Sequence, residues 1–164
     1  MPLTLRSGNG TDFGVILPMV HRSIDDLAAA DKCYTLRPDA DARLRRWLGP
    51  VMEDPRGMLL IAEVDGVIAG FLAATVEQTV PIFLCEEYAL VRLLWVEPQY
   101  RRHGVATALL DQAANDYAKM GLPQIRIRAR HGDASDRTLE KARFRESTMT
   151  FVRDLARLHQ RGSK

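Results

Sequence analysis

The 164-residue chain has few cysteines, little net charge and no long apolar run, and each shortage excludes a class of protein. Cys33 and Cys85 lie far apart and form no Cys-x-x-Cys pair, which indicates a reduced, cytoplasmic protein and argues against a metal site. A net charge of +2 is too small for a surface built to bind nucleic acid. The N-terminus lacks the apolar region of a signal peptide, and no apolar run approaches the roughly 20 residues that cross a bilayer, so no membrane partner is expected.

Apolar residues, by contrast, make up 46% of the chain. This share predicts a folded globular protein rather than a disordered one. The length suits one domain, and no linker or repeat divides it. We therefore expect a single domain over residues 1–164, ordered to about residue 158, with a short C-terminal tail.

Two helices are predicted after a short first strand at 3–7. Thr11 or Asp12 is placed to cap the first helix. The second helix starts near Asp41 and is expected to end in the segment 49–57, which contains two glycines and two prolines. Three residues at helical spacing are predicted to face inward from the second helix: Leu44, Trp47 and Leu48.

A β-hairpin is the clearest local feature of the chain. Two apolar runs, 58–64 and 67–77, are separated by the dipeptide Asp65–Gly66. This dipeptide favours a two-residue type I′ turn, in which both residues take positive φ. The rest of the chain is predicted to form a long central strand, a helix, a strand, a helix and a last strand, at 86–96, 104–120, 124–130, 135–144 and 147–155.

The strand at 124–130 must follow the long strand through a right-handed crossover, because a helix separates the two in sequence. The two strands are therefore parallel, whereas the hairpin is antiparallel. The pattern predicts an α/β (α+β) fold with a mixed, mostly antiparallel sheet and packed helices.

Basic residues and a glycine meet at the junction "WVEPQYRRHGVATALL", where the long strand leads into a helix. A helix N-terminus has unpaired N–H groups and partial positive charge, which suits an anion such as phosphate. Gly104 and Ala106 are small, and Arg101, Arg102 and His103 add positive charge. The spacing fits neither a P-loop nor a dinucleotide fingerprint. An ordinary surface turn with solvated arginines is the alternative.

The junction resembles motif A of the GNAT superfamily of N-acetyltransferases, Arg/Gln-x-x-Gly-x-Gly/Ala, matched here by Arg101, Gly104 and Ala106. The resemblance implies a sheet with a V-shaped splay between two parallel strands, helices on both faces, and acetyl-CoA as cosubstrate. The pantetheine arm would pair with the backbone of the strand, and the pyrophosphate would lie on the turn and the first helical residues. The implied binding residues are Leu94, Trp95, Val96, Arg101, Arg102, His103, Gly104, Val105, Ala106 and Thr107.

The resemblance also implies direct attack of a primary amine on the thioester, with a backbone N–H near Val96 as the oxyanion donor. The catalytic base is expected to be a carboxylate at the start of the long strand, Glu86 or Glu87. Glu86 is preferred because it shares strand parity with Leu94 and Val96. His131 is a further candidate base. All three side chains have a plainer interpretation as solvated polar residues.

The family's usual proton donor is missing from this chain. The family segment resembles Leu-Tyr-Glu-Lys-x-Gly-Phe, but "TLEKARF" has Leu139 at the tyrosine position and Arg143 at the glycine position. Gly132 replaces an asparagine often found shortly before this helix. Tyr34, Tyr88, Ser135 or a water are the alternative proton donors. A GNAT-fold module that binds acyl-CoA without catalysis is therefore the second functional hypothesis.

The acceptor is not readable beyond a small-molecule or peptide amine, and the pattern leaves open a homodimer through an exposed strand edge. One feature bears on the acceptor. Arg126, Arg128 and Arg130 alternate along the strand 124–130 and share one face. They could recognise an acidic acceptor or the coenzyme 3′-phosphate. Alternatively, they form an arginine ladder that pairs with helix carboxylates such as Glu140.

Overall fold

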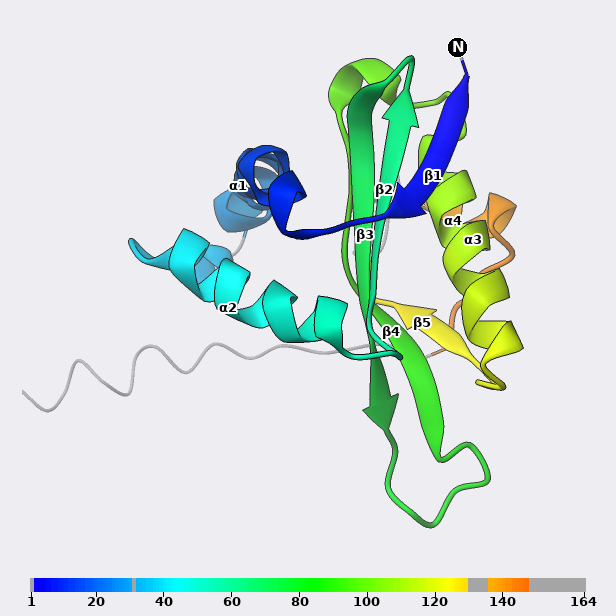
Figure 1. The fold of residues 1–164 in the computed structure, drawn as a ribbon. Coiled ribbons are helices and arrows are strands. Elements are labelled where there is room, and N and C mark those ends of the chain that lie inside the picture. The colour runs from blue at the N-terminus through cyan, green and yellow to red at the C-terminus, as the bar shows by residue number, and fades with distance from the viewer. Residues whose placement is uncertain (1, 31, 130–135, 148–164) are drawn as a thin grey trace, which may run out of the picture.

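The computed structural model describes residues 2–30, 32–129 and 136–147 (Figure 1). Its helices and strands are, in chain order, β1 (Leu3–Ser7), α1 (Phe13–Ala30), α2 (Ala40–Glu53), β2 (Met58–Val64), β3 (Val67–Gln78), β4 (Glu87–Val96), α3 (Val105–Lys119), β5 (Ile125–Ile127) and α4 (Asp136–Lys141). The strand predicted at 147–155 lies outside the described residues except for Ser147. The other predicted elements are present, although β5 is much shorter than expected.

The five strands form one sheet in the order β1-β2-β3-β4-β5. Neighbours from β1 to β4 are antiparallel, and β4 pairs with β5 in parallel. The mixed, mostly antiparallel α+β fold is therefore confirmed. The turn between β2 and β3 is also confirmed, because Asp65 and Gly66 both take positive φ, 51° and 77°.

Helices cover both faces of the sheet, with α1 and α2 on one side and α3 and α4 on the other (Figure 1). We call these the α1/α2 face and the α3 face. The apolar cluster on the α3 face includes Leu60, Leu72 and Leu109, and the cluster on the α1/α2 face includes Ile16, Leu48 and Phe71. Both clusters therefore use alternate residues of β2 and β3, as a two-sided sheet requires.

The second helix differs from its prediction in one residue. Leu48 is fully buried and Leu44 partly buried, as expected, but Trp47 is 36% exposed, so its inward placement was wrong. The helix continues through Gly49 and Pro50 and ends at Glu53, within the segment predicted to end it. Proline is tolerated because it lies on the exposed side of the last turn, where water can bond to the carbonyl group that loses its N–H partner.

A 3₁₀ turn, Gly10–Asp12, leads into α1 and has a polar cap of its own. Asn9 caps this turn by accepting a hydrogen bond from the N–H of Thr11, and the Asp12 side chain accepts one from the N–H of Asn9 at 2.8 Å. Asp12 is 4% exposed and accepts bonds from both terminal nitrogens of Arg6, at 3.0 and 2.7 Å. These bonds hold the pKa of Asp12 below its ordinary value.

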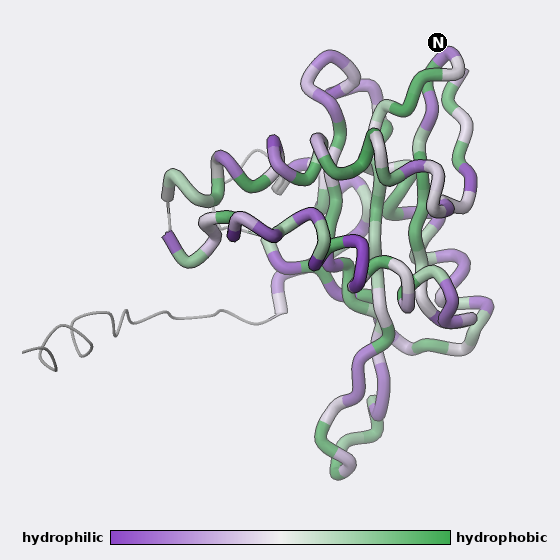
Figure 2. The backbone as a smooth tube through the Cα atoms, turned by 60° about the vertical axis from the view of Figure 1, so that its left-hand side comes forward, coloured by the Kyte–Doolittle hydropathy of each residue, from purple (hydrophilic) through white to green (hydrophobic). Residues whose placement is uncertain are grey.

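The hairpin of β3 and β4 projects beyond the rest of the molecule (Figure 1). The loop at its tip is apolar, as its green colour in Figure 2 shows. Val80, Ile82, Phe83 and Leu84 are all more than half exposed, and Leu84 is fully exposed. An exposed apolar run of this kind is typical of an interaction surface.

Candidate functional site

The parallel pair β4–β5 is short, and this leaves one edge of β4 open. Only Ala89, Leu90 and Val91 of β4 pair with β5. The strand continues for five further residues to Val96. At about 3.3 Å per residue, the open edge is roughly 16 Å long. Within the described ranges, no strand lies beside it, so its main-chain groups are free to bind an extended ligand.

A bulge at Arg92 divides β4 into two halves. Ala74 of β3 pairs with Val91 but Ala73 pairs with Leu93, so Arg92 is an extra residue in β4. Before the bulge, Ala89 and Val91 pack on the α3 face. After it, the residues on the α3 face are Leu94 and Val96, while Leu93 and Trp95 lie on the α1/α2 face. Odd-numbered residues of β4 therefore lie on the α3 face before the bulge, and even-numbered residues lie on that face after it.

This exchange overturns the parity on which Glu86 was preferred as the base. Glu86 lies before the bulge, so it does not share a face with Leu94 and Val96 through strand alternation. The sequence contains no sign of the extra residue, because 89–96 is almost continuously apolar.

The main-chain groups of Leu94 and Val96 point into the splay. The N–H of Glu97 bonds to Ala69 of β3 at 2.9 Å, and the groups of a strand alternate sides, so Trp95 also faces β3. A Cβ at Gly70 would lie only 2.5 Å from the Trp95 carbonyl oxygen, which agrees with this orientation. Leu94 and Val96 therefore present their N–H and C=O groups to the open edge.

Arg101 connects the end of β4 to the turn. Its Nε donates to the Val96 carbonyl at 2.9 Å, and its guanidinium lies 4.4 Å from the centre of the Trp95 ring. These contacts hold the strand end and the turn together and keep positive charge beside the splay. The buried Nε1 of Trp95 has no hydrogen-bond partner among the described residues, an arrangement that costs about 1–3 kcal/mol.

The turn before α3 has the backbone geometry of a phosphate cradle. Arg102 and Gly104 both take positive φ, 65° and 81°, and α3 begins at Val105. The N–H of Ala108 donates to the Gly104 carbonyl at 2.9 Å, which is the first bond of the helix. In the described part of the chain, the N–H groups of residues 102–107 have no hydrogen-bond acceptor. These donors and the helix dipole favour an anion at this point.

The charge around the turn is positive. Arg102 and His103 are exposed, and no acidic residue occurs from 98 to 110. The nearest carboxylate, Glu97, is buried and forms an ion pair with Arg22 of α1, which neutralises its charge. The turn therefore presents uncompensated positive charge to solvent.

The two candidate bases at the start of β4 lie far from the turn. Nine or ten strand residues separate Glu86 and Glu87 from Val96, which is about 30 Å along a strand. Glu87 forms an ion pair with Arg56, and this contact holds its pKa below the ordinary value. Glu86 is exposed, and His131 lies outside the described residues. The structure thus brings together 94–96 and 101–107 but does not bring Glu86 or Glu87 to them.

A carboxylate that sequence reasoning missed lies nearer to the splay. Glu77 of β3 accepts bonds from Thr75 Oγ1 at 2.9 Å and from the bulge residue Arg92 at 2.6 Å. The hydrogen bond from Thr75, and then the contact with Arg92, hold the pKa of Glu77 below its ordinary value. The sequence gives no signal for this group, because Glu77 and Arg92 meet only through the strand register.

The altered family segment is accommodated structurally. Leu139 of α4 is partly buried and packs against the cluster on the α3 face, so it contributes only apolar surface. Arg143 takes φ 61° just after the helix, a conformation that suits the glycine of the family pattern. The turn closes with a bond from the N–H of Phe144 to the Leu139 carbonyl at 2.9 Å.

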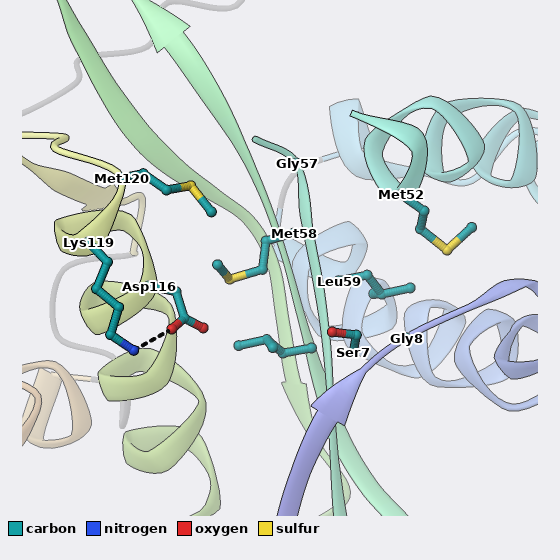
Figure 3. A pocket seen from close by; sticks show the side chains of 10 residues that line it. Ser7, Gly8, Met52, Gly57, Met58, Leu59, Asp116, Lys119 and Met120 are labelled. Carbon is teal, nitrogen blue, oxygen red and sulfur yellow. Dashed lines mark hydrogen bonds and ion pairs between the residues drawn. The ribbon is translucent and has the colours of Figure 1, made fainter. Parts of the chain in front are cut away.

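Two hollows of the described surface lie at the opposite end of α3 from Gly104. One, of about 390 Å³, is lined by residues that include Met52, Met58 and Met120, and the Asp116–Lys119 ion pair lies at its side (Figure 3). The other, of about 310 Å³, adjoins the hairpin at Leu84. Neither hollow includes the turn or the open edge of β4.

The family model of the acetyltransferase (GNAT) family matches residues 22–142, which include β4, the turn and α3. The chain belongs to the GNAT family. A search of curated proteins gave no match. The GNAT assignment agrees with the sheet order, the parallel pair and the position of the motif that Arg101, Gly104 and Ala106 form.

Several solved structures share this GNAT fold at low sequence identity. A "predicted acetyltransferase" of Clostridium acetobutylicum, solved with acetyl-CoA, has a TM-score of 0.72 and 18% identity, over 95% of this chain and 98% of that one. Glucosamine-6-phosphate N-acetyltransferase of Arabidopsis thaliana has a TM-score of 0.71 and 12% identity, over 94% and 99%. Aminoglycoside 6′-N-acetyltransferase of Acinetobacter haemolyticus has a TM-score of 0.68 and 17% identity, over 93% of this chain and 99% of that one.

Two searches of the described residues gave negative results. They contain no helix that is both long and apolar enough to span a membrane. Within the same residues, no three His, Cys, Asp or Glu side chains are grouped closely enough to hold a metal ion.

Proposed function

We propose that the protein is an N-acetyltransferase that transfers the acetyl group of acetyl-CoA to a primary amine within a ternary complex. The observation that carries the proposal is the open edge of β4 at Leu94 and Val96, which leads directly to the unpaired N–H groups at Gly104. An extended amide chain that ends in a pyrophosphate matches this sequence of groups. The expectation of one catalytic domain over residues 1–164 is part of the same proposal.

The residues present fit the coenzyme in chemical type. The main-chain groups of Leu94 and the N–H of Val96 would bind the pantetheine amides, and the N–H groups of 102–107 would bind the pyrophosphate. Arg101 would act mainly by holding the turn against β4, since its Nε is already bonded to Val96. When bound, acetyl-CoA supplies an activated acyl group. The reaction forms an amide C–N bond and breaks the C–S bond. Of the two protons that the ammonium loses, one passes through the base to solvent and the other ends on the thiol of coenzyme A.

Deprotonation of the amine is the more demanding proton transfer. An alkyl ammonium with a pKa near 10.4 is about three units above neutral pH, which costs roughly 4 kcal/mol. A thiol with a pKa near 8.5 costs only roughly 1.4 kcal/mol when it leaves as thiolate at pH 7.5. A base therefore matters more than the proton donor that Leu139 fails to supply.

Glu77 is our proposed base, acting through a water molecule, in place of Glu86. The backbone of Glu77 pairs with Tyr88, but its carboxylate reaches the bulge residue Arg92 at 2.6 Å, whereas Glu86 precedes β4 and is exposed. The carboxylate is ionised at neutral pH and can accept a hydrogen bond from the ammonium or from water; its lowered pKa makes it a weaker base, so its role is to orient that water. We expect Glu77→Gln to reduce kcat at least tenfold with coenzyme binding intact, and Glu86→Gln to have little effect. If Glu86→Gln instead reduced kcat more than Glu77→Gln, Glu86 would be the better candidate for the base.

A binding module without catalysis is the second hypothesis, because Leu139 cannot donate a proton. Thermal denaturation with acetyl-CoA comes first. Ligand at 100 times Kd should stabilise the protein by about 2.7 kcal/mol, and the absence of any shift would reject both hypotheses. Thiol release in the presence of a panel of amines then decides between them. An enzyme releases thiol only when an acceptor is present, and a module releases none.

A homodimer is also part of the proposal. The chain supplies both the exposed apolar loop 80–84 and, beside it, the 310 Å³ hollow at Leu84. In a dimer with a two-fold axis, the loop of each copy would lie in the hollow of the other. Two-fold symmetry is the commonest symmetry of protein oligomers. Light scattering after gel filtration tests this: a monomer at all concentrations would reject it.

A further inference from the structure

A polar part of the sheet lies next to the splay on the α1/α2 face. The apolar cluster under α1 and α2 includes Ala73 of β3 and Leu93 of β4. Within the described residues, no later position of β3 and no earlier position of β4 belongs to that cluster. On this face, the side chains after Ala73 in β3 and before Leu93 in β4 are therefore not covered by α1 and α2.

Arginines dominate this uncovered area. Ile125 and Ile127 of β5 pack on the α3 face, so Arg126 and Arg128 project from the α1/α2 face. Arg92, at the bulge, lies on the same face because it contacts Thr75, whose neighbours Ala74 and Val76 pack on the α3 face. All three arginines are exposed. We call the surface that they form the basic face: Arg92, Arg126 and Arg128.

The contacts of the basic face leave most of its charge uncompensated. Arg92 pairs with Glu77 at 2.6 Å. Arg126 lies 3.8 Å from the centre of the Tyr88 ring and donates to Gln124, which is neutral, at 3.1 and 2.9 Å. Arg128 has no hydrogen bond or ion pair within the described ranges and acts on Glu77 only at longer range. Among the residues that the structure describes, one carboxylate thus pairs with or faces three guanidinium groups.

This arrangement bears on the two roles considered for the strand arginines. A ladder that pairs with helix carboxylates such as Glu140 is not formed by Arg126 or Arg128 in the described structure. The Arg126 guanidinium instead lies on the sheet surface, oriented by the Tyr88 ring and the Gln124 amide, and Arg128 projects from the same face. Uncompensated guanidinium groups favour an anion from outside, because each can donate two parallel hydrogen bonds to a carboxylate or phosphate.

The basic face borders the point where the splay opens. Val91 and Ile127 form the last pair between β4 and β5, and Arg92 and Arg128 each lie one residue beyond that pair. A group bound to these arginines would therefore be beside the start of the open edge. The pyrophosphate cradle at Gly104 is at the other end of that edge, about 16 Å away along the strand. The two positive regions are thus separate.

We propose that the basic face binds an anionic group of the acceptor, so that the substrate is a primary amine that also carries a carboxylate or a phosphate. This inference rests on the proposed acetyl transfer and specifies its acceptor. It also excludes a polycationic acceptor, because like charges would be brought together at the arginines.

Matched pairs of amines test the proposal with the wild-type protein. Butylamine and 4-aminobutyrate have closely similar amine basicity and differ in one carboxylate. Glucosamine and glucosamine 6-phosphate differ in one phosphate and distinguish the two anion types. We expect the anionic member of at least one pair to have a kcat/KM tenfold or more above that of its neutral partner. Added salt should reduce this preference.

Variants connect the preference to the basic face. Arg128→Gln should raise KM for the preferred anionic amine about tenfold or more, with kcat and the neutral amine little changed. Arg128→Lys retains the charge and should recover most of the affinity. Arg137→Gln removes an exposed positive charge from α4, on the opposite side of the sheet, and is the matched control. Coenzyme binding, measured by calorimetry, should be unchanged in all three variants.

The failure of this inference can be told apart from failure of the proposed function. If acetyl-CoA binds and neutral amines or kanamycin are acetylated as well as or better than the anionic amines, the acceptor assignment is wrong while the transferase assignment holds. The same follows if Arg128→Gln and Arg137→Gln affect KM equally. If acetyl-CoA does not bind at all, both are rejected. A tenfold preference that Arg128→Gln abolishes and Arg128→Lys retains supports both.

Discussion

Replacing Gly104 by glutamate tests the proposed phosphate cradle at its centre. Gly104 takes φ 81°, and a Cβ added there would meet no other atom within 4 Å. The substitution therefore introduces backbone strain without a packing clash. The left-handed conformation costs an ordinary residue about 1–2 kcal/mol. For a chain of this length, each kcal/mol lowers the midpoint of thermal unfolding by roughly 2–4 °C, so the variant should remain folded at room temperature.

Coenzyme binding should be affected far more than stability. The new carboxylate would lie beside the N–H groups that the pyrophosphate needs. Two unit charges about 5 Å apart at an effective dielectric constant near 20 repel by roughly 3 kcal/mol, which is over 100-fold in Kd. Arg102→Ala removes one exposed charge and leaves the main-chain donors in place, so we expect a loss of only a few-fold.

Gly121 offers a matched control at the other end of α3. It takes φ 85°, and an added Cβ would likewise meet nothing within 4 Å. Gly121→Glu should thus cost the same stability without affecting the coenzyme. The assays are calorimetric titration with coenzyme A and thermal unfolding without ligand. If Gly104→Glu and Gly121→Glu lose equal stability and bind coenzyme A with the same Kd as wild type, the cradle is not at Gly104.

Three further predictions concern stability and assembly. Asp12→Asn should lower the free energy of unfolding in urea by about 1–3 kcal/mol, since it leaves Arg6 with one fewer charged partner. Because the pKa of Asp12 is lowered in the folded state, the wild type should lose this contribution as the pH falls below about 4, and the variant should lose less. Arg143→Gly should raise the free energy of unfolding by about 1 kcal/mol, by relieving its positive φ. Leu84→Asp should abolish the proposed dimer in light scattering without lowering the thermal midpoint, because Leu84 is fully exposed.

Local rules predicted the parts of the fold that depend on neighbours in sequence. Asp65–Gly66 specifies its turn because only a few residue pairs accept positive φ twice, and Gly104 and Gly121 bound α3 for related reasons. The end of α2 lies within the segment 49–57 predicted for it, although Pro50 itself does not stop the helix, because water can replace the lost hydrogen bond there. Trp47 follows the helical period but lies at the edge of the covered face.

Features that depend on register could not be predicted from the chain. The bulge at Arg92 exists because β4 has one residue more than β3 between two paired positions, and no residue type signals that. A prediction that assumes regular alternation along β4 misses the contact between Glu77 and Arg92. It also assigns Glu86 to the wrong face. The turn at Gly104 was predictable because the residues of motif A are close together in sequence. Glu77 and Arg92 come from different strands, so their contact depends on the pairing of β3 with β4.

The bulge makes Arg92 the one residue of β4 that can be lost without changing the faces of the others. Val91 pairs with Ala74 and Leu93 with Ala73, so a strand without Arg92 would keep both pairs and would alternate regularly. The main-chain groups of Leu94 and Val96 would still point to the open edge, while the basic face would lose one arginine. Among related sequences, a gap of one residue at this position would therefore change acceptor recognition and leave the coenzyme edge of the strand intact. Alignments that slide across the apolar run would conceal it.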